Sequence, residues 1–134
     1  SMTTQTIQYD KPSFLHWEGH PTNSRTRVKA AKPVKAGEVL VLTDKGYEPF
    51  KGTTLPTILA SAVPGAVVAF ALADADKDAQ VPCVIRNATI LIDKLTGVAA
   101  DAFDDTKPLH PLVAHCNAQG IALNTSIATQ RGFA

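Results

Sequence analysis

The sequence has few cysteines, few aromatic residues and no long hydrophobic run. It contains two cysteines and one tryptophan in 134 residues, and aromatic residues make up 6% of the chain. Two cysteines are too few for the dense disulfide framework of small secreted domains. Proline, glycine or a charged residue interrupts every apolar run before it reaches the length of a membrane span, about 18 residues. We therefore predict neither a disulfide scaffold nor a membrane-spanning segment.

The chain also lacks an excess of charge of either sign. It has 13 Lys and Arg against 12 Asp and Glu, which gives a formal net charge of +1 at pH 7. A nearly neutral chain has no overall field that would attract nucleic acid or an anionic membrane. Hydrophobic residues are 45% and charged residues 19%, a composition typical of one globular domain with its own core.

The first residues, Ser1-Met2-Thr3-Thr4, lack the basic and then apolar pattern of a secretion signal. We therefore expect synthesis in a reducing cytoplasm. Ser1, which precedes Met2, is interpreted as a cloning remnant and left out of the fold prediction.

Residues 1–24 differ from the rest of the chain and predict an extended N-terminal arm. The run from Thr3 to Tyr9 is polar but rich in residues typical of strands, and Asp10-Lys11-Pro12 ends it before a partner strand follows. A strand without a local partner is expected to pair with another chain. The contact residues expected in this arm lie on its two strand faces or are aromatic anchors: Thr6, Ile7, Gln8, Tyr9, Phe14 and Trp17.

Basic residues cluster directly after the arm. Residues 25–37 contain five basic and no acidic residues, whereas residues 38–134 contain seven basic and ten acidic ones. The alternation from Arg25 to Ala30 predicts an edge strand whose charged side, with Arg25, Arg27 and Lys29, faces water. These basic residues alternate with Thr, Val and Ala rather than with stacking aromatics, so we do not predict binding to nucleic acid.

Residues 25–134 are predicted to form short strands joined by sharp turns, followed by one helix. Strands are expected at 38–43, 47–50, 66–72, 81–86, 88–92 and 121–123, whereas 55–63 fits either one helical turn or irregular structure. Leu109, Leu112, Val113 and Cys116 recur with helical spacing, and Gly120 follows the end of this helix. This order predicts a β-rich α+β fold.

No metal-binding motif is complete. Asp74-x-Asp76-x-Asp78 resembles the start of a calcium loop, but Ala79 and Ile85 stand where glycine and a bidentate glutamate are needed. His16 and His20 alone leave a metal ion short of ligands. We predict no bound metal and no cofactor.

The residues that resemble catalytic groups have simpler interpretations. Cys83 and Cys116 fall on apolar stretches and are predicted to be core thiols, with a disulfide between them as the less favoured alternative. A hydrolase that uses His115 or the cluster Asp101, Asp104 and Asp105 is a distant alternative, because no nucleophile or phosphate-binding motif accompanies these residues. We predict a protein that is not an enzyme.

Several segments resemble a known family. These are Lys35-Ala36-Gly37-Glu38-Val39-Leu40, Gly46-Tyr47-Glu48-Pro49, Val67 to Asp74, Val84-Ile85-Arg86 and the closing stretch from Leu109 to Leu123. Over residues 35–123 the chain resembles head decoration proteins of the lambda type, small capsid-stabilising proteins of tailed bacteriophages. Many relatives have glycine where this chain has Asn87, a residue that tolerates the left-handed conformation.

The resemblance implies a structural virion protein on the outer surface of the capsid. Such proteins bind the expanded head as homotrimers and hold neighbouring capsomers together, so the implied partners are the major capsid protein of a tailed phage and other copies of the chain. The arm would then add a strand to a sheet edge of the capsid, and Arg25, Arg27 and Lys29 would meet acidic capsid side chains at the rim. Residues 25–134 would be the decoration domain.

The sequence also leaves open one function of a different class. A β-rich virion or surface module could bind carbohydrate through exposed aromatic side chains, for which Trp17 and Tyr47 are the candidates.

Overall fold

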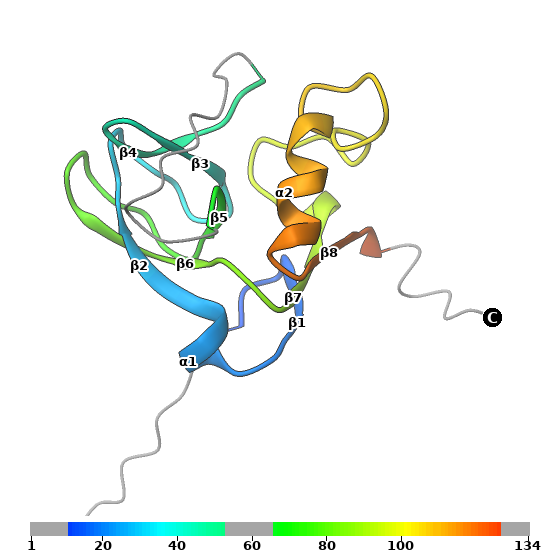
Figure 1. Cartoon of the computed structure of the whole chain (residues 1–134), viewed down its shortest axis with the longest axis horizontal. Coiled ribbons are helices and arrows are strands. Elements are labelled where there is room, and N and C mark those ends of the chain that lie inside the picture. The colour runs from blue at the N-terminus through cyan, green and yellow to red at the C-terminus, as the bar shows by residue number, and fades with distance from the viewer. Residues whose placement is uncertain (1–10, 53–65, 127–134) are drawn as a thin grey trace, which may run out of the picture.

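The computed structural model describes residues 11–52 and 66–126 and confirms a β-rich α+β fold (Figure 1). The described residues form two sheets, with one helix longer than a single turn. In chain order, with η for 3-10 turns, the elements are β1 (Leu15–Glu18), α1 (Pro21–Ser24), β2 (Arg25–Lys29), β3 (Val39–Thr43), β4 (Gly46–Pro49), β5 (Val68–Ala71), β6 (Gln80–Val84), β7 (Ala88–Leu91), η1 (Ile92–Lys94), η2 (His110–Leu112), α2 (Val113–Ala118) and β8 (Ile121–Asn124).

Five strands form a curled antiparallel sheet in the order β2-β6-β5-β3-β4. Its two edge strands approach each other, because the Ala31 N–H donates to the Tyr47 carbonyl at 2.8 Å and Ala30 bridges Tyr47. The sheet therefore almost closes on itself, and we call it the barrel. Its interior is filled by apolar side chains that include Val28, Leu40, Leu42, Tyr47, Val81, Cys83 and Ile85.

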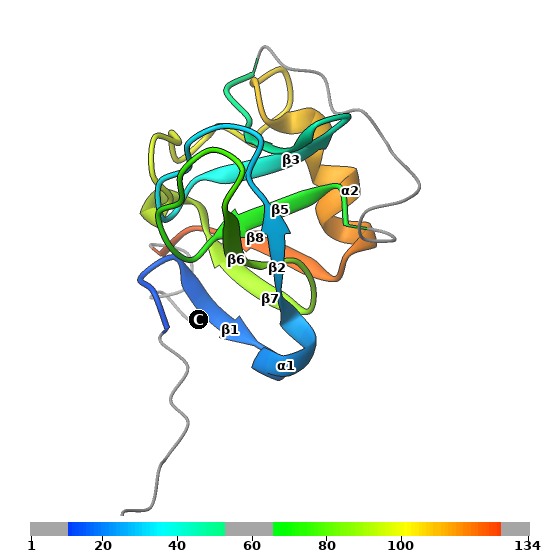
Figure 2. The same cartoon turned by 90° about the vertical axis from the view of Figure 1, so that its left-hand side faces the viewer.

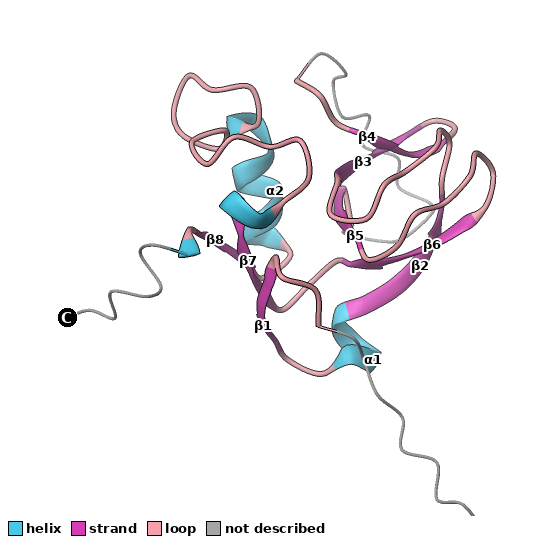
Figure 3. Ribbon diagram, turned by 180° about the vertical axis from the view of Figure 1, so that it is seen from behind, coloured by secondary structure: helices cyan, strands magenta, loops and turns pink. Residues whose placement is uncertain are grey.

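The other three strands form a small sheet in the order β1-β7-β8, in which β1 is antiparallel and β8 parallel to β7. Figure 3 shows α2 above this sheet and the barrel to the right of both. A second core fills the space between them, and its members include Phe14, Leu15, Val39, Val41, Val68, Phe70, Ile90, Leu112, Cys116 and Ile121. Strands β3 and β5 are buried on both faces because one face meets each core.

Most of the predicted elements are present. The hairpin β3–β4 turns at Asp44–Lys45, with Thr43 opposite Gly46, as its turn residues predict. Asn87 has φ of 51° between β6 and β7, and Gly120 has φ of 71° after α2. The α-helix is shorter than its apolar spacing suggests, because the stretch with Pro111 forms the 3-10 turn η2. The segment 55–63 lies outside the described residues.

The structure corrects the predicted arm of residues 1–24. Strand β1 pairs with β7 of the same chain, Leu15 opposite Ile90, and Phe14 is 3% exposed in the second core. Residues 11–24 therefore belong to the domain. The prediction was wrong there because the partner strand of β1 lies some seventy residues further along the chain, beyond the reach of any local pattern. Residues 1–10, with Thr6, Ile7, Gln8 and Tyr9, lie outside the described residues.

One buried amide joins the elements of the two cores. The Gln119 side chain, after α2, accepts from the N–H groups of Val67 at 3.0 Å and Val68 at 3.1 Å. Its amide nitrogen donates to the carbonyl oxygens of Val68 and Ile85, each at 2.7 Å. The Gln119 backbone carbonyl accepts from the Asn87 N–H at 3.1 Å. A single residue thus connects α2 to β5 and to the turn between β6 and β7.

Replacing this amide should destabilise the fold strongly. We expect Gln119→Leu to lower the free energy of unfolding by about 2–5 kcal/mol, because buried backbone groups lose their partners at about 1–3 kcal/mol each. Urea unfolding followed by circular dichroism measures the change. Asn117→Ala, at an exposed position of the same helix, is the control and should change stability by less than about 0.5 kcal/mol. A loss below 1 kcal/mol for Gln119→Leu would contradict the assignment.

Candidate functional site

The outer face of the small sheet carries an exposed aromatic side chain. Among the described residues, Trp17 is the only large hydrophobic residue that is exposed, at 55%. It lies opposite Thr89 of β7, which in turn lies beside Ala122 of β8. We call this row of Trp17, Thr89 and Ala122 the tryptophan face. Because Thr89 and Ala122 are small, they leave the indole ring prominent on the surface.

A break in the alternation of β1 explains why Trp17 is exposed although Leu15, two residues earlier, is buried. Leu15 points into the second core, and a register shift between Leu15 and Trp17 breaks the regular pairing with β7. Both His16 and Trp17 are exposed as a result. Of the two aromatic anchors predicted in this segment, Phe14 is therefore a core residue, whereas Trp17 is available for contact with a partner.

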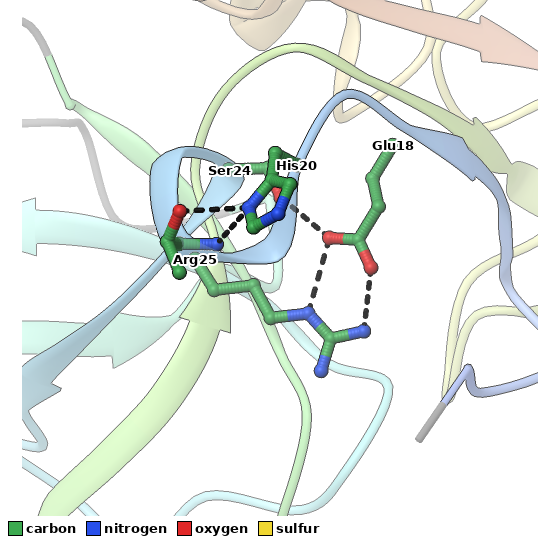
Figure 4. A network of polar contacts seen from close by, with 5 residues as sticks. Glu18, His20, Ser24 and Arg25 are labelled. Carbon is green, nitrogen blue, oxygen red and sulfur yellow. Dashed lines mark hydrogen bonds and ion pairs between the residues drawn. The ribbon is translucent and has the colours of Figure 1, made fainter. Parts of the chain in front are cut away.

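A polar network fixes the end of β1 to the start of β2 (Figure 4). The Arg25 guanidinium donates to both carboxylate oxygens of Glu18, through Nη2 to Oε1 at 2.6 Å and through Nε to Oε2 at 3.1 Å. The Ser24 hydroxyl also donates to Oε2, at 2.5 Å. Burial raises the pKa of Glu18, but the bonds from Arg25 and Ser24 outweigh it and hold the pKa below its usual value.

The short helix α1 between these strands is capped by the residue before it. The Thr22 N–H donates to Nδ1 of His20 at 3.2 Å, and the Thr22 hydroxyl lies 2.7 Å from the same nitrogen. The side chain of His20 is thus engaged in a local cap. Together with the Glu18–Arg25 pair, this cap sets the direction in which the chain enters β2.

The three basic residues predicted for the rim have different surroundings. Arg25 is drawn into the pair with Glu18, and only 15% of its side chain is exposed, so its charge is already compensated within the domain. Lys29 lies 3.8 Å from Asp78 in a solvent-exposed pair. Arg27 is exposed on β2, the barrel's edge strand. Of the three, Arg27 and Lys29 are thus the ones whose charge is accessible at the surface.

Tyr47, proposed above as a sugar-binding aromatic, is buried inside the barrel. It is 1% exposed, and its hydroxyl donates to the Ala66 carbonyl at 2.5 Å. Burial raises the pKa of Tyr47 to about 12. The prediction of an exposed Tyr47 was wrong because this ring points into the barrel, where its hydroxyl bonds to Ala66, just before β5.

The two cysteines are core thiols, as predicted. Both are free and buried, Cys83 inside the barrel and Cys116 on the inner side of α2. Burial raises the pKa of each thiol to about 12, which keeps both in the unreactive protonated form at neutral pH.

The other polar candidates lie at the surface. Asp101, Asp104 and Asp105 are exposed, and Asp101 pairs with Lys107 at 3.3 Å. Within 11–52 and 66–126, no group of three or more His, Cys, Asp or Glu side chains is arranged to hold a metal ion. No buried side-chain nitrogen or oxygen in these segments lacks a hydrogen-bond partner.

Comparisons with known proteins add no assignment. No protein-family model and no curated protein sequence matches this chain. In the part of the chain that the structure describes, no helix is long and apolar enough to cross a membrane.

The sequence analysis did not predict two features of this surface. The Glu18–Arg25 pair was not predicted, although opposite charges at the two ends of a short connection are a usable signal. The three-residue row of the tryptophan face depends on the pairing of β1, β7 and β8, and no pattern within 11–20 indicates it.

The Glu18 network should make stability depend on pH. Because the folded-state pKa of Glu18 is lowered, its ionised form stabilises the fold above the ordinary glutamate value of 4.5, and this contribution is lost as the pH falls through the lowered pKa. We expect Glu18→Gln to cost about 1–3 kcal/mol at pH 7 and to flatten the pH dependence of unfolding below pH 4.5. Urea unfolding between neutral and acidic pH measures both effects.

The control for this experiment is Lys29→Gln. Its pair with Asp78 is long and exposed, so its loss should change stability by less than about 0.5 kcal/mol. Equal effects of the two substitutions would mean that the Glu18 network contributes no more than an ordinary surface pair.

Proposed function

We propose that this chain is a structural virion protein that decorates the outside of a tailed-phage head and holds neighbouring capsomers together. The proposal rests on the resemblance of residues 35–123 to lambda-type head decoration proteins. The observation that carries it furthest is the edge position of β1, which follows the N-terminal segment in the sequence and carries the exposed Trp17.

The position of β1 supports a contact made by backbone hydrogen bonds. Within the described residues, β1 pairs on one side only, with β7. Residues 2–10 precede this edge, and their composition favours a strand. In the proposed mechanism they add a strand to a capsid sheet edge, with Ile7 and Tyr9 on one face and Thr6 and Gln8 on the other.

The energetics of such a protein favour several weak contacts over one strong contact. A decoration protein that binds the expanded capsid lattice but not its precursor stabilises the expanded form by mass action. A single short strand binds weakly, but three copies joined in a trimer raise the effective concentration, and avidity exceeds single-arm affinity by roughly 10²–10⁴. Arg27 and Lys29 then assist encounter with an acidic capsid rim more than they add affinity.

The N-terminal segment can be tested separately from the domain. Because Phe14 and β1 belong to the fold, the informative deletion ends at residue 10. Removing residues 2–10 should abolish binding to expanded shells of the cognate capsid protein, while the circular dichroism spectrum and unfolding free energy stay unchanged. Co-sedimentation with expanded and with precursor shells measures binding. Undiminished co-sedimentation of the shortened chain would remove this segment from the mechanism.

A pair of double variants tests which face of the segment meets the capsid. Ile7→Asp with Tyr9→Asp places two charges on the apolar face and should weaken co-sedimentation by at least about tenfold. Thr6→Asp with Gln8→Asp adds the same charge to the opposite face and serves as the matched control, with an expected change of less than about threefold. Equal losses would show that the assignment of faces is wrong.

A further inference from the structure

A groove lined mainly by apolar side chains lies between the β3–β4 end of the barrel and the loop 96–109. It has a volume of about 370 Å³, and its apolar walls include Phe50, Val98 and Leu109. The charged residues of its lining pair with each other, Lys51 with Glu38 at 3.7 Å and Lys107 with Asp101 at 3.3 Å. Because these charges compensate locally, the groove suits an apolar side chain and has no preference for a ligand of either sign.

The walls of the groove are fixed by hydrogen bonds. The Thr96 hydroxyl donates to the Ala36 carbonyl at 2.7 Å, and the Thr96 N–H donates to the Gly37 carbonyl at 2.9 Å. The Leu109 N–H donates to the Ala102 carbonyl at 2.9 Å, which closes the loop on itself. The groove is therefore built into the fold.

The described part of the chain ends close to this groove. The Ser126 N–H donates to Oδ1 of Asp93 at 2.8 Å, and the Ser126 hydroxyl donates to Oδ2 of the same carboxylate. Asp93 lies in η1, and Thr96, three residues later, lines the groove. Figure 2 shows the last described residues, in red-brown, just below the yellow-green turn η1, with the yellow start of the loop 96–109 above it. The residues after Ser126 therefore begin only a short distance from the groove wall.

One of these residues has both an apolar side chain and sufficient reach. Residues 127–134 contain two large apolar side chains, Ile127 and Phe133. Seven residues of extended chain span up to roughly 23 Å, so Phe133 can reach the groove from Ser126, whereas Ile127 directly follows Ser126 and lacks this reach. The other four phenylalanines of the sequence are all buried in the fold: Phe14, Phe50, Phe70 and Phe103.

The tether favours this segment over the N-terminal residues and over a free peptide. Figures 1 and 2 both place β1 at the bottom of the molecule and the loop 96–109 near the top, so residues 1–10 start from the opposite end. A short tether gives Phe133 an effective concentration on the order of millimolar. A single apolar side chain, too weak an anchor for a free peptide, is then sufficient to fill the groove.

We propose that residues 127–134 fold back onto their own domain and that the side chain of Phe133 occupies the groove between β3–β4 and the loop 96–109. This contact covers an apolar hollow that would otherwise be open to other apolar groups. The proposal goes beyond the proposed function, which assigns no contact to the residues after Ser126. It is tested on the isolated chain without any capsid, so the two fail independently.

The first test uncovers the groove. Phe133→Ala should raise the fluorescence of Nile red, a neutral dye that is bright in apolar surroundings, at least about fivefold, because the dye no longer competes with a tethered side chain. Ile127→Ala is the matched control in the same segment and should leave the fluorescence unchanged. Equal fluorescence of Phe133→Ala and the unaltered chain would overturn the proposal.

The second test locates the dye that Phe133→Ala admits. Ala99 is exposed and lines the groove, whereas Ala100 is exposed and does not. Adding Ala99→Arg to Phe133→Ala should return the fluorescence to the level of the unaltered chain, and adding Ala100→Arg should not. A rise in fluorescence that Ala99→Arg fails to reverse would place the dye elsewhere and would contradict the assignment of the groove.

The third test determines where the C-terminal residues lie. Ala99→Cys with Ala134→Cys places one thiol on the groove wall and one beside Phe133, while the native Cys83 and Cys116 are buried and unreactive. A short bismaleimide should join the two thiols within one chain, seen by mass spectrometry as a monomer that carries one linker. The control, Ala122→Cys with Ala134→Cys, has an exposed thiol closer in the sequence and should react at least about tenfold more slowly.

Two outcomes of the crosslinking would overturn the proposal. Equal rates for the two pairs would mean that the C-terminal residues have no preference for the groove. Covalent dimers in place of linked monomers would mean that the segment occupies the groove of another copy. Adding Phe133→Ala to the Ala99→Cys and Ala134→Cys pair should reduce its rate to that of the control, which ties the preference to the aromatic side chain.

Discussion

The side-chain amide of Gln119 is the interaction on which the relative placement of the two sheets depends. It uses both of its functional atoms, accepting twice from β5 and its preceding residue and donating to two carbonyl oxygens, one beside the β6–β7 turn. In an apolar interior each of these backbone groups would otherwise be left without a partner, which is costly. An apolar side chain of similar size would fill the same space but would not satisfy these backbone groups.

This constraint also positions the surface that we assign to contact with partners. Gln119 holds the end of α2 against the barrel, and β8 begins two residues later beside β7. Strand β1 completes the small sheet on the other side of β7 and is fixed to β2 by the pair of Glu18 and Arg25. The tryptophan face therefore rests on a central strand, β7, that is paired on both sides, and on β1, which is held by β7 and by the Glu18–Arg25 pair. A rigid platform of this kind loses little conformational entropy on binding.

Whether a feature of the fold or of the candidate site could be predicted depends on how far apart in the sequence its contacting residues lie. The β3–β4 hairpin, the turn at Asn87 and the glycine after α2 are encoded within a few residues, and local turn chemistry predicted them. The pairing of β1 with β7 and the fourfold bonding of Gln119 join residues far apart in the chain, so no local pattern contains them. Tyr47 is an intermediate case. Its strand was predicted from local sequence, but the inward direction of its side chain depends on the barrel, which no single segment specifies.

The same separation explains why the segment around Phe14 resembled an arm. A strand whose partner is absent from the neighbouring sequence looks identical whether that partner lies later in the same chain or on another polypeptide. The two cases differ in the side chains: Phe14 and Leu15 are buried in their own core, whereas Trp17 remains exposed although β1 is already paired. Backbone pairing inside the chain therefore excludes β1 itself as an arm. Within residues 11–52 and 66–126 the outer edge of β1 has no strand partner, and its indole is exposed. Trp17 adds nothing to the core of its own domain, and an exposed indole on an edge strand suits the contact with a partner that we propose.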